Sequence, residues 1–520
     1  MAKDIHAQSV PLPKFPMSAF DLGHSMKYTT SAGKMACHYL EECIPSDIAH
    51  IKTDLFIRLD PLTFPIMHKV KVRQNFFFVP TRLLLGDELN EDFFSCKDLS
   101  AKLPSLYWNE DDEGPCPFCS AGNLSDMMGI QPVVYDSANK KTRVLRNPLP
   151  LFAYQKVWAD YYADEVFDSQ ALGYVEQDLD SYRSVGLNGS LDASGLMRTL
   201  YYNLVSYSKD RFTSAQPDAQ RVGEVYLMNP LSLERVDGVP MPSVNTTVCT
   251  DSSGLLKINQ TGYPSLRTDL TIDELWDEMA VQRFLNSLNE FGNERYIEIL
   301  AGQFGVISQD ARLQRSQWLG GNECVVNISE VLQTSETTSA SPLGSYGGRG
   351  IVAGKGRDIS FRVPEHGYII GIQTIVPENG YASGTPRLFY KSTPLDFAMP
   401  RFNNLGESSV YNGELFSDHL ADALTNDLGE FGYQPQYDEY RSHPSRSTME
   451  FRDSQFLAWH LDRKFTSVPP LNANFIHINN VTNNRIFNDT DTEADHYRVH
   501  AFHKAMYVRP ISRHPVPGKL

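Results

Sequence analysis

The sequence lacks the features of secreted, membrane-spanning and disulfide-stabilised proteins. No apolar segment follows the polar first residues, so we expect no secretory signal peptide. No apolar run approaches the roughly 18 residues of a membrane-spanning helix, so we expect no membrane insertion. Seven cysteines are spread over 520 residues, an odd number that suits a reducing compartment better than a disulfide framework. We therefore expect a soluble protein made in a cytoplasm.

Positive charge is also scarce, because 47 Lys and Arg oppose 63 Asp and Glu and give a formal net charge of −16. This balance excludes a protein that coats nucleic acid by bulk attraction. Residues 496–520 are a local exception, with five basic residues and no acidic one. These candidate nucleic-acid-contacting residues are Arg498, Lys504, Arg509, Arg513 and Lys519. The alternative is a final strand whose solvent face is basic.

The residues that are present favour a globular, mainly β fold. Val70 and Val72 alternate with basic residues in 67–79, the period of a half-buried strand, and Pro80 ends it. Further strands are predicted at 359–363, 368–376 and 497–508. A strand at 497–508 would place His500 and His503 on opposite faces. Residues 150–166 have helical spacing of their apolar side chains.

The distribution of prolines, glycines and charge predicts one domain with long insertions. Frequent prolines make residues 1–65 an extended N-terminal arm, and residues 66–520 form a single domain. The predicted insertions are a cysteine-containing acidic loop at 96–125, an elaborated surface excursion at 222–270 and a helical insertion at 271–305. Residues 335–357 are expected to form a flexible loop because they are rich in Ser, Thr and Gly.

Four short motifs resemble chemical sites but are incomplete. Cys116 and Cys119 have the spacing of a zinc or redox pair, yet no second pair follows. Residues 348–356 imitate a phosphate-binding loop with the wrong glycine spacing. Histidines at 496–503 would not share one face of a strand, and the acidic run 489–495 lacks the glycine of a calcium loop. We expect no catalytic residue, no metal site and no cofactor.

Seven segments, in order, resemble the major capsid proteins of the Microviridae, small single-stranded DNA bacteriophages, and specifically the gokushovirus branch. Phe76-Phe77-Phe78-Val79-Pro80-Thr81-Arg82 is similar to the family's Phe-Phe-Val-Pro-x-Arg, and Phe20-Asp21-Leu22-Gly23-His24-Ser25 to its Phe-Asp-x-Ser-His. The other five segments are at 153–165, 210–221, 295–321, 431–441 and 459–467. The most specific of them contains Asp310-Ala311-Arg312-Leu313-Gln314-Arg315. The resemblance covers about residues 20 to 510.

The resemblance implies a fold and an assembly. The fold would be an eight-stranded antiparallel jelly roll of the viral capsid type, with long loop and helical insertions. Sixty copies would form a T=1 icosahedral shell around circular single-stranded DNA, with residues 222–270 as the protrusion at the threefold axes. Because each chain carries −16, we expect a small basic DNA-packaging protein to help neutralise the genome. We expect the five basic residues of 496–520 to touch the DNA.

The resemblance also implies where the protein is found and which other partners it has, and the residues leave one competing function open. The family implies a virion location, synthesis in the host bacterial cytoplasm, a host cell-surface receptor, a glycan among the choices, and a scaffolding protein. The alternative function is that of a cytoplasmic β-sandwich protein that binds or acts on carbohydrate. An enzyme would work as a small oligomer and would depend on one acidic residue, whereas a capsid protein would form large uniform particles without catalysis.

Overall fold

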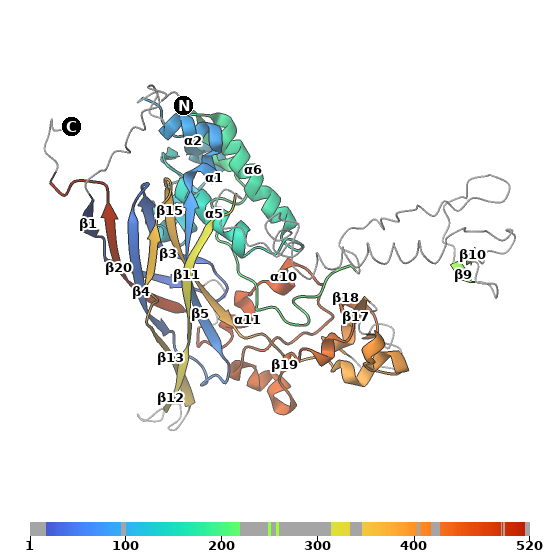
Figure 1. The fold of residues 1–520 in the computed structure, drawn as a ribbon. Coiled ribbons are helices and arrows are strands. Elements are labelled where there is room, and N and C mark those ends of the chain that lie inside the picture. Colours follow the sequence, from blue (N-terminus) through green and yellow to red (C-terminus); the bar gives the residue numbers. More distant parts are fainter. Residues whose placement is uncertain are drawn as a thin grey trace, which may run out of the picture.

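The structure is a computed structural model of the whole chain. It describes residues 17–94, 100–218, 248–250, 256–258, 314–332, 346–402, 406–417, 427–489, 491 and 494–514. In these residues the architecture is mainly β, with antiparallel pairing in both large sheets and few helices (Figure 1). The expected mainly β fold is confirmed.

The larger sheet has seven strands and joins the two ends of the described chain. Its central strands are β20 (Tyr497–Arg509) and β4 (Ile48–Leu59), which pair antiparallel along most of their length. The other strands are β1 (Ser18–Asp21), β2 (His24–Thr30), β12 (Asn327–Leu332), β13 (Tyr346–Gly354) and β14 (Ile359–Arg362). β1 and β2 both pair with β20, β13 and β14 pair with β4, and β12 pairs with β13. The strand predicted at 497–508 is thus confirmed.

The smaller sheet has four strands in the order β11, β5, β15 and β3. Their bounds are Gln317–Val325 for β11, Val70–Pro80 for β5, Gly367–Pro377 for β15 and Ala36–Cys43 for β3. All eleven residues of β15 are buried, because both faces of this strand are covered. The predicted strands at 67–79 and 368–376 are confirmed, and β5 ends at Pro80 as expected.

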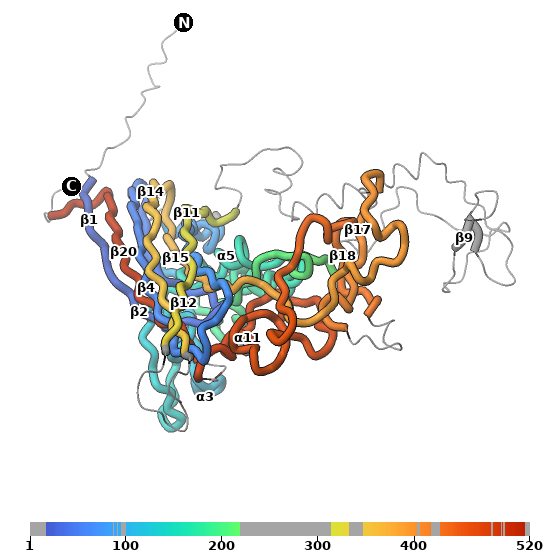
Figure 2. Tube along the Cα trace, turned by 90° about the horizontal axis from the view of Figure 1, so that it is seen from below, coloured from blue at the N-terminus to red at the C-terminus, as the bar shows by residue number. Residues whose placement is uncertain are grey.

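The two sheets lie face to face and share a hydrophobic core. Along β4 and β20, every second side chain is buried, which is the pattern of strands with one covered face. One core cluster joins Ile51 and Tyr507 of the larger sheet to Phe78 and Ile369 of the smaller sheet. The Tyr39 and Tyr507 hydroxyl oxygens lie 2.9 Å apart across this core. The elements therefore form a β-sandwich, seen edge-on in Figure 2.

Helices cover the outer face of the smaller sheet. α5 (Leu149–Tyr161) contacts β5 and β15, and its Trp158 and Tyr154 are fully buried. The Phe77 ring on β5 lies 4.7 Å from the Tyr161 ring, centroid to centroid. The other α-helices in the described part of the chain are α1 (Thr81–Leu85), α2 (Asp87–Phe94), α3 (Glu110–Glu113), α4 (Leu124–Met127), α6 (Ser169–Val185), α10 (Ala473–Ile476) and α11 (Asn480–Asn484). The helix predicted at 150–166 is confirmed.

Short strands build two further regions beside the sandwich. The region predicted as a cysteine loop contains β6 (Ser105–Asn109), which pairs with β7 (Thr142–Leu145) and β8 (Ser190–Asp192). A second region, which we call the C-terminal lobe, spans the described residues between 380 and 476 (Figure 1). Its strands are β16 (Gly380–Tyr381), β17 (Glu407–Tyr411), β18 (Glu430–Pro435) and β19 (Ser445–Arg446). A separate apolar cluster around Phe212, Tyr381 and Phe475 forms its core.

The structure differs from the sequence prediction at the N-terminal arm. Residues 18–59, which we expected to be part of an extended arm that wraps the domain or reaches a neighbour, form β1, β2, β3 and β4 and contribute to both sheets. Pro45 lies between β3 and β4, and Pro61 and Pro65 lie between β4 and β5. The prolines therefore mark turns between strands rather than an arm, because proline suits positions that donate no ladder hydrogen bond.

The flexible loop predicted at 335–357 is also corrected, because residues 346–354 form β13 between β12 and β4. Its glycines allow close approach to neighbouring chain. A Cβ on Gly348 would lie 2.6 Å from the Phe64 carbonyl oxygen, and one on Gly350 would lie 2.7 Å from Leu59. Glycine here marks tight packing within a strand rather than flexibility.

Two predicted insertions lie largely or wholly outside the described residues. Of the surface excursion at 222–270, the structure describes only β9 (Val248–Thr250) and β10 (Leu256–Ile258), which pair antiparallel. The helical insertion at 271–305 falls outside the description, and so does Lys519.

Candidate functional site

The outer face of the seven-stranded sheet is the first candidate surface. No described element covers it, so the outward side chains of β20 and β4 alternate with the buried core residues. On β20 the outward residues include Arg498, His500, Phe502, Lys504 and Met506. Phe502 and Met506 are 44% and 42% exposed, so two large apolar side chains of this strand face solvent. We call this surface, with the outward residues of β4 and β2, the open sheet face.

The register of the open sheet face brings like charges together. Arg498 lies directly opposite Arg58, and Lys504 lies directly opposite Lys52. Like charges in opposed cross-strand positions are destabilising. Lys27 of β2 lies opposite His500 and extends the basic area to the sheet edge. The register therefore gathers several cations on one face of the sheet, of which Lys52 forms an ion pair with Asp358 at 3.0 Å.

Acidic residues offset part of this charge. Arg498 forms an ion pair with Asp60 at 2.8 Å, and Lys504 forms one with Asp54 at 3.2 Å. Burial alone would raise the pKa of Asp54, but hydrogen bonds from Gly356 N–H and Lys504 lower that pKa overall. The side chains of Arg498 and Lys504 nevertheless stay 69% and 70% exposed. Both cations keep donors that face solvent.

The remaining predicted nucleic-acid contacts do not join this face. Arg509 pairs with Glu41 at 2.9 Å and with Asp47 at 3.2 Å, and its side chain is only 18% exposed. Burial raises the pKa of both Glu41 and Asp47, although Arg509 acts in the opposite direction. Arg513 donates to the Ala19 carbonyl at 2.8 Å. The structure therefore brings together two of the five predicted residues and directs Arg509 into the protein.

Sequence reasoning missed the aromatic and basic residues that surround Arg498 and Lys504. The His500 and Phe502 rings are 3.9 Å apart, and the Arg58 guanidinium lies 5.2 Å from the Phe56 ring centroid. A cavity of about 540 Å³ opens where β1, β20, β4 and β14 meet. It is lined by Asp21, Gly23, His50, Ile51, Lys52, Asp358, Ile359, Ser360, His503, Lys504, Ala505 and Met506. The alternation of Ile48–Leu59 could have predicted the β4 part of this face.

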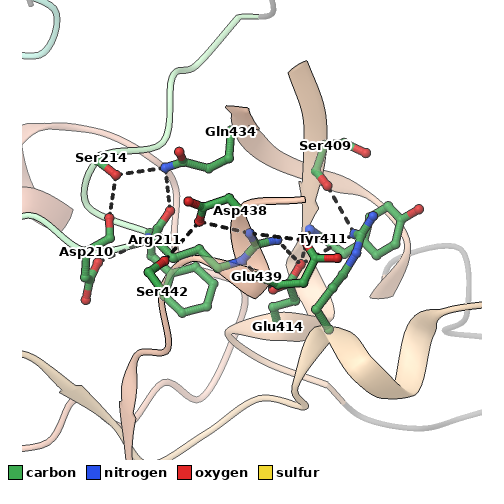
Figure 3. Close-up of polar contacts among 12 residues, drawn as sticks. Asp210, Arg211, Ser214, Ser409, Tyr411, Glu414, Gln434, Asp438, Glu439 and Ser442 are labelled. Carbon is green, nitrogen blue, oxygen red and sulfur yellow. Dashed lines mark hydrogen bonds and ion pairs between the residues drawn. The ribbon is translucent and has the colours of Figure 1, made fainter. Parts of the chain in front are cut away.

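A second candidate surface lies next to a buried network of ion pairs between Arg211 and the C-terminal lobe (Figure 3). Arg211 donates from Nε and Nη2 to the two carboxylate oxygens of Glu414, at 3.0 and 3.2 Å. Its Nη1 donates to Asp438 at 3.1 Å, and Lys391 pairs with Glu439 at 2.6 Å. The side chains of Arg211 and Glu414 are 2% and 1% exposed. Burial disfavours the charged form of Arg211, but Glu414 outweighs it and raises the Arg211 pKa.

This network fixes a chain segment that exposes apolar side chains to solvent. We call residues 388–399 the apolar ridge, because it exposes Leu388, Phe389, Leu395, Phe397 and Met399 by 41% to 73%. Lys391 and Arg387 tie the ridge to Glu439 and Glu414. Several exposed large apolar side chains on one short segment are typical of a site of protein contact. The ridge is thus a rigid apolar surface suited to association.

The chemical motifs of the sequence have other surroundings. Cys119 N–H donates to the Cys116 carbonyl at 3.2 Å within a 3₁₀ turn, and burial raises the pKa of the Cys116 thiol to about 12. His503 is buried whereas His500 points outward, which confirms that they occupy opposite faces. Among the described residues, no group of three or more His, Cys, Asp or Glu could hold a metal ion. No described helix is long and apolar enough to cross a membrane.

A β-sandwich with one open basic face and an exposed apolar ridge indicates a protein that associates with others through its surfaces. Viral coat proteins are the class with this arrangement. Residues 9–519 match the family described as "Capsid protein (F protein)", so the chain belongs to this capsid protein family. The resemblance to the gokushovirus capsid proteins of the Microviridae is thereby confirmed. The chain is a major capsid protein, located in the virion.

Three relatives named capsid protein VP1 resemble this chain over most of its length. The relative from Chlamydia phage 1 is 26% identical, covering 98% of this chain and 96% of the relative. The relative from Bdellovibrio phage phiMH2K is 27% identical, covering 90% and 89%. The relative from Spiroplasma virus 4 is 25% identical, covering 89% and 87%. Similarity over nearly whole chains supports one function for the complete chain.

Proposed function

We propose that this chain forms a T=1 icosahedral shell of sixty copies around circular single-stranded DNA, without catalysing a reaction. Membership of the capsid protein family supports assembly into a multi-subunit shell. Closed symmetry lets many moderate contacts produce one stable particle. The relatives described above are all capsid proteins, so we retain this interpretation over a carbohydrate-binding or carbohydrate-active sandwich.

We propose that eight strands of the sandwich form the jelly roll. β2, β20, β4 and β13 are neighbours in one sheet, and β3, β15, β5 and β11 are neighbours in the other. Within this set of eight, the chain often passes from one sheet to the other between successive strands: β3 to β4, β4 to β5, β13 to β15 and β15 to β20. Two packed sheets with such crossovers are the arrangement expected of a double-sheet jelly roll. β1, β12 and β14 are additions to this set.

We propose that the open sheet face contacts the DNA, through Arg498 and Lys504 among the predicted residues. The observation that carries this is the register that places Arg498 opposite Arg58 and Lys504 opposite Lys52, on a face that no described element covers. A polyanion would relieve their mutual repulsion. Exposed rings such as Phe502 offer bases a stacking surface of the kind that single-strand-binding proteins use.

The other predicted residues and partners remain proposals. Arg509 and Arg513 make contacts within the protein, so we assign their first role to holding β20 against its neighbours. The proposal that Lys519 contacts the DNA rests on the sequence alone. We also retain the basic packaging protein, the scaffolding protein, the host receptor and the threefold protrusion at 222–270. The net charge of −16 supports the first of these, because the shell alone would repel a genome.

The test of the DNA-contact proposal is the salt dependence of binding to an oligothymidylate. Every cation that no longer reaches a phosphate should reduce the slope of log affinity against log salt by about 0.7 for a single strand. We expect the double variant Arg498→Gln, Lys504→Gln to bind more weakly and to reduce that slope by about 1.4, since it removes two cations at about 0.7 each. The measurement is fluorescence anisotropy at several salt concentrations.

A matched control separates local contact from net charge. Arg401 and Lys140 are also exposed and also contribute one guanidinium and one ammonium, but they lie away from the sheet. The double variant Arg401→Gln, Lys140→Gln should keep the wild-type slope. Equal slopes for both double variants would show that the open sheet face has no special role.

A further inference from the structure

Arg463 is a buried cation without an acidic partner in the described part of the chain. It is 8% exposed and makes no ion pair there, and its Nη1 meets no hydrogen-bond acceptor. Its Nη2 donates to the Phe475 carbonyl at 2.7 Å. Buried charges in proteins are normally paired, because removing an ion from water is costly. Arg463 therefore differs from Arg211, which reaches into the same lobe and pairs with Glu414, Asp438 and Glu439.

Aromatic rings surround the Arg463 guanidinium. Its central carbon lies 4.0 Å from the Phe475 ring centroid, 5.1 Å from those of Tyr207 and Phe465, and 5.9 Å from that of Tyr381. The faces of these rings attract a cation, so they offset part of its desolvation. They provide no full negative charge, and the positive field of Arg463 extends through this apolar region.

A cavity of about 280 Å³ adjoins this cation and is lined by donors but by no carboxylate. Arg463, Lys464 and His477 line it, together with the amides of Asn472 and Asn474. His477 lies 3.1 Å from Asp168, so that carboxylate is already engaged. The Lys464 ammonium is exposed and donates to the Arg452 carbonyl at 2.6 Å. Aromatic and proline side chains, together with Asn479 and Thr482, form the remaining wall.

We propose that this cavity binds a phosphate group, which supplies the negative charge that Arg463 lacks. A phosphate presents several acceptor oxygens and makes charge-assisted hydrogen bonds with Lys and Arg, which suits the donors gathered here. The cavity lies in the C-terminal lobe and shares no lining residue with the cavity on the open sheet face. The phosphate comes either from free inorganic phosphate or from a nucleic-acid backbone.

The test is the thermal unfolding of the purified subunit in potassium phosphate and in potassium chloride of equal ionic strength and pH. A ligand that binds only the folded state raises the midpoint with concentration. We expect phosphate to raise the Tm of the wild type. Lys464→Gln should raise the dissociation constant for phosphate about tenfold, because it removes one charged contact. Arg463→Gln should abolish the shift. Lys464 is exposed, so its variant keeps the test decisive if the Arg463 variant does not fold.

The control and a second ligand make the outcomes distinct. Lys140→Gln removes another exposed lysine that donates to a backbone carbonyl, and it should keep the full phosphate shift. A shift with inorganic phosphate that Lys464→Gln reduces supports a free-ion site. A shift with oligothymidylate alone, reduced by the same variant, assigns the phosphate to nucleic acid. No shift with either ligand, or equal shifts in wild type and Lys464→Gln, overturns the proposal.

Discussion

His503 illustrates how a single residue ties stability to acidity in the sandwich core. Its ring stacks parallel to that of His38 at 5.4 Å and lies 4.7 Å from that of His24. Its Nδ1 lies 2.8 Å from the Thr53 hydroxyl oxygen. Burial, and then the neighbouring His24, lower the His503 pKa from 6.5 to about 4. Burial also lowers the pKa of His38 well below its ordinary value.

We predict that the folded subunit loses stability as pH falls from about 6.5 to about 4. The unfolded chain takes up a proton at His503 near its ordinary pKa, whereas the folded chain does so only near pH 4. The unfolded state therefore binds more protons in this window, and acid favours it. His503 alone should contribute about 3 kcal/mol of loss by pH 4. Urea unfolding at several pH values measures the effect.

The matched variants lie on one strand and point to opposite faces. His503→Gln should flatten the decline in stability between pH 6.5 and 4. His500→Gln, on the outward face of β20, should leave it nearly unchanged. A decline that persists in full in the His503 variant would refute the assignment to this core histidine.

Among the elements, those with a strong local pattern were predictable and those defined by distant contacts were not. The alternation around Val70 and Val72 predicted β5, and the apolar spacing near Trp158 predicted α5. β1, β2, β3 and β4 were misread as an arm because Pro45, Pro61 and Pro65, which sit in the turns after β3 and β4, were read as signs of an extended segment. β13 was misread as a loop because its glycines are required by Phe64 and Leu59, which no local pattern shows.

The residues of the candidate surfaces were likewise predictable only where they lie close together in the sequence. Arg498 and Lys504 were found because they lie in one acid-free stretch of sequence. Their opposite residues, Arg58 and Lys52, come from a strand more than 400 residues earlier, and only the register of β20 with β4 reveals them. Arg509, the last residue of β20, points into the protein and pairs with Glu41. Counting the basic residues of the sequence therefore overestimated the number of cations on the open sheet face.

A prediction at this scale concerns the glycines of β13. Gly348→Ala should destabilise the fold by about 1–3 kcal/mol, because the new methyl group would lie 2.6 Å from the Phe64 carbonyl oxygen. Gly347→Ala is the matched control in the same strand, since its nearest neighbouring atom would be 3.6 Å away. Urea unfolding of both variants checks this, and equal stabilities would show that β13 is not tightly packed here.

For the whole molecule, capsid family membership and the exposed apolar ridge support assembly through surfaces. Obligate interfaces between subunits bury large apolar areas, often above about 2,000 Å². The ridge exposes Phe389 by 73% and Phe397 by 51%, and the buried pair of Arg211 and Glu414 anchors the lobe beneath it. Removing Arg211 would leave the buried Glu414 carboxylate with only the longer 3.5 Å pair to Arg387 among its described cations, so the network matters for the shape of the ridge.

We predict that Phe389→Glu blocks shell formation and leaves the folded subunit intact. A charge on the ridge would have to be desolvated at each contact between copies, whereas in the free subunit it stays in water. Phe502→Glu is the matched control, because it places the same charge on the open sheet face. Size-exclusion chromatography and circular dichroism should show folded small species for Phe389→Glu and particles for the control. Normal particles from Phe389→Glu would remove the ridge from the interface.

Electron microscopy of particles purified from cells that express the complete set of phage proteins, combined with nuclease protection, tests whether this chain forms a DNA-enclosing shell. We expect uniform isometric shells with the symmetry of sixty copies, which protect circular single-stranded DNA from nuclease. A chain that remains a small oligomer under these conditions and protects no DNA would contradict assembly into such a shell.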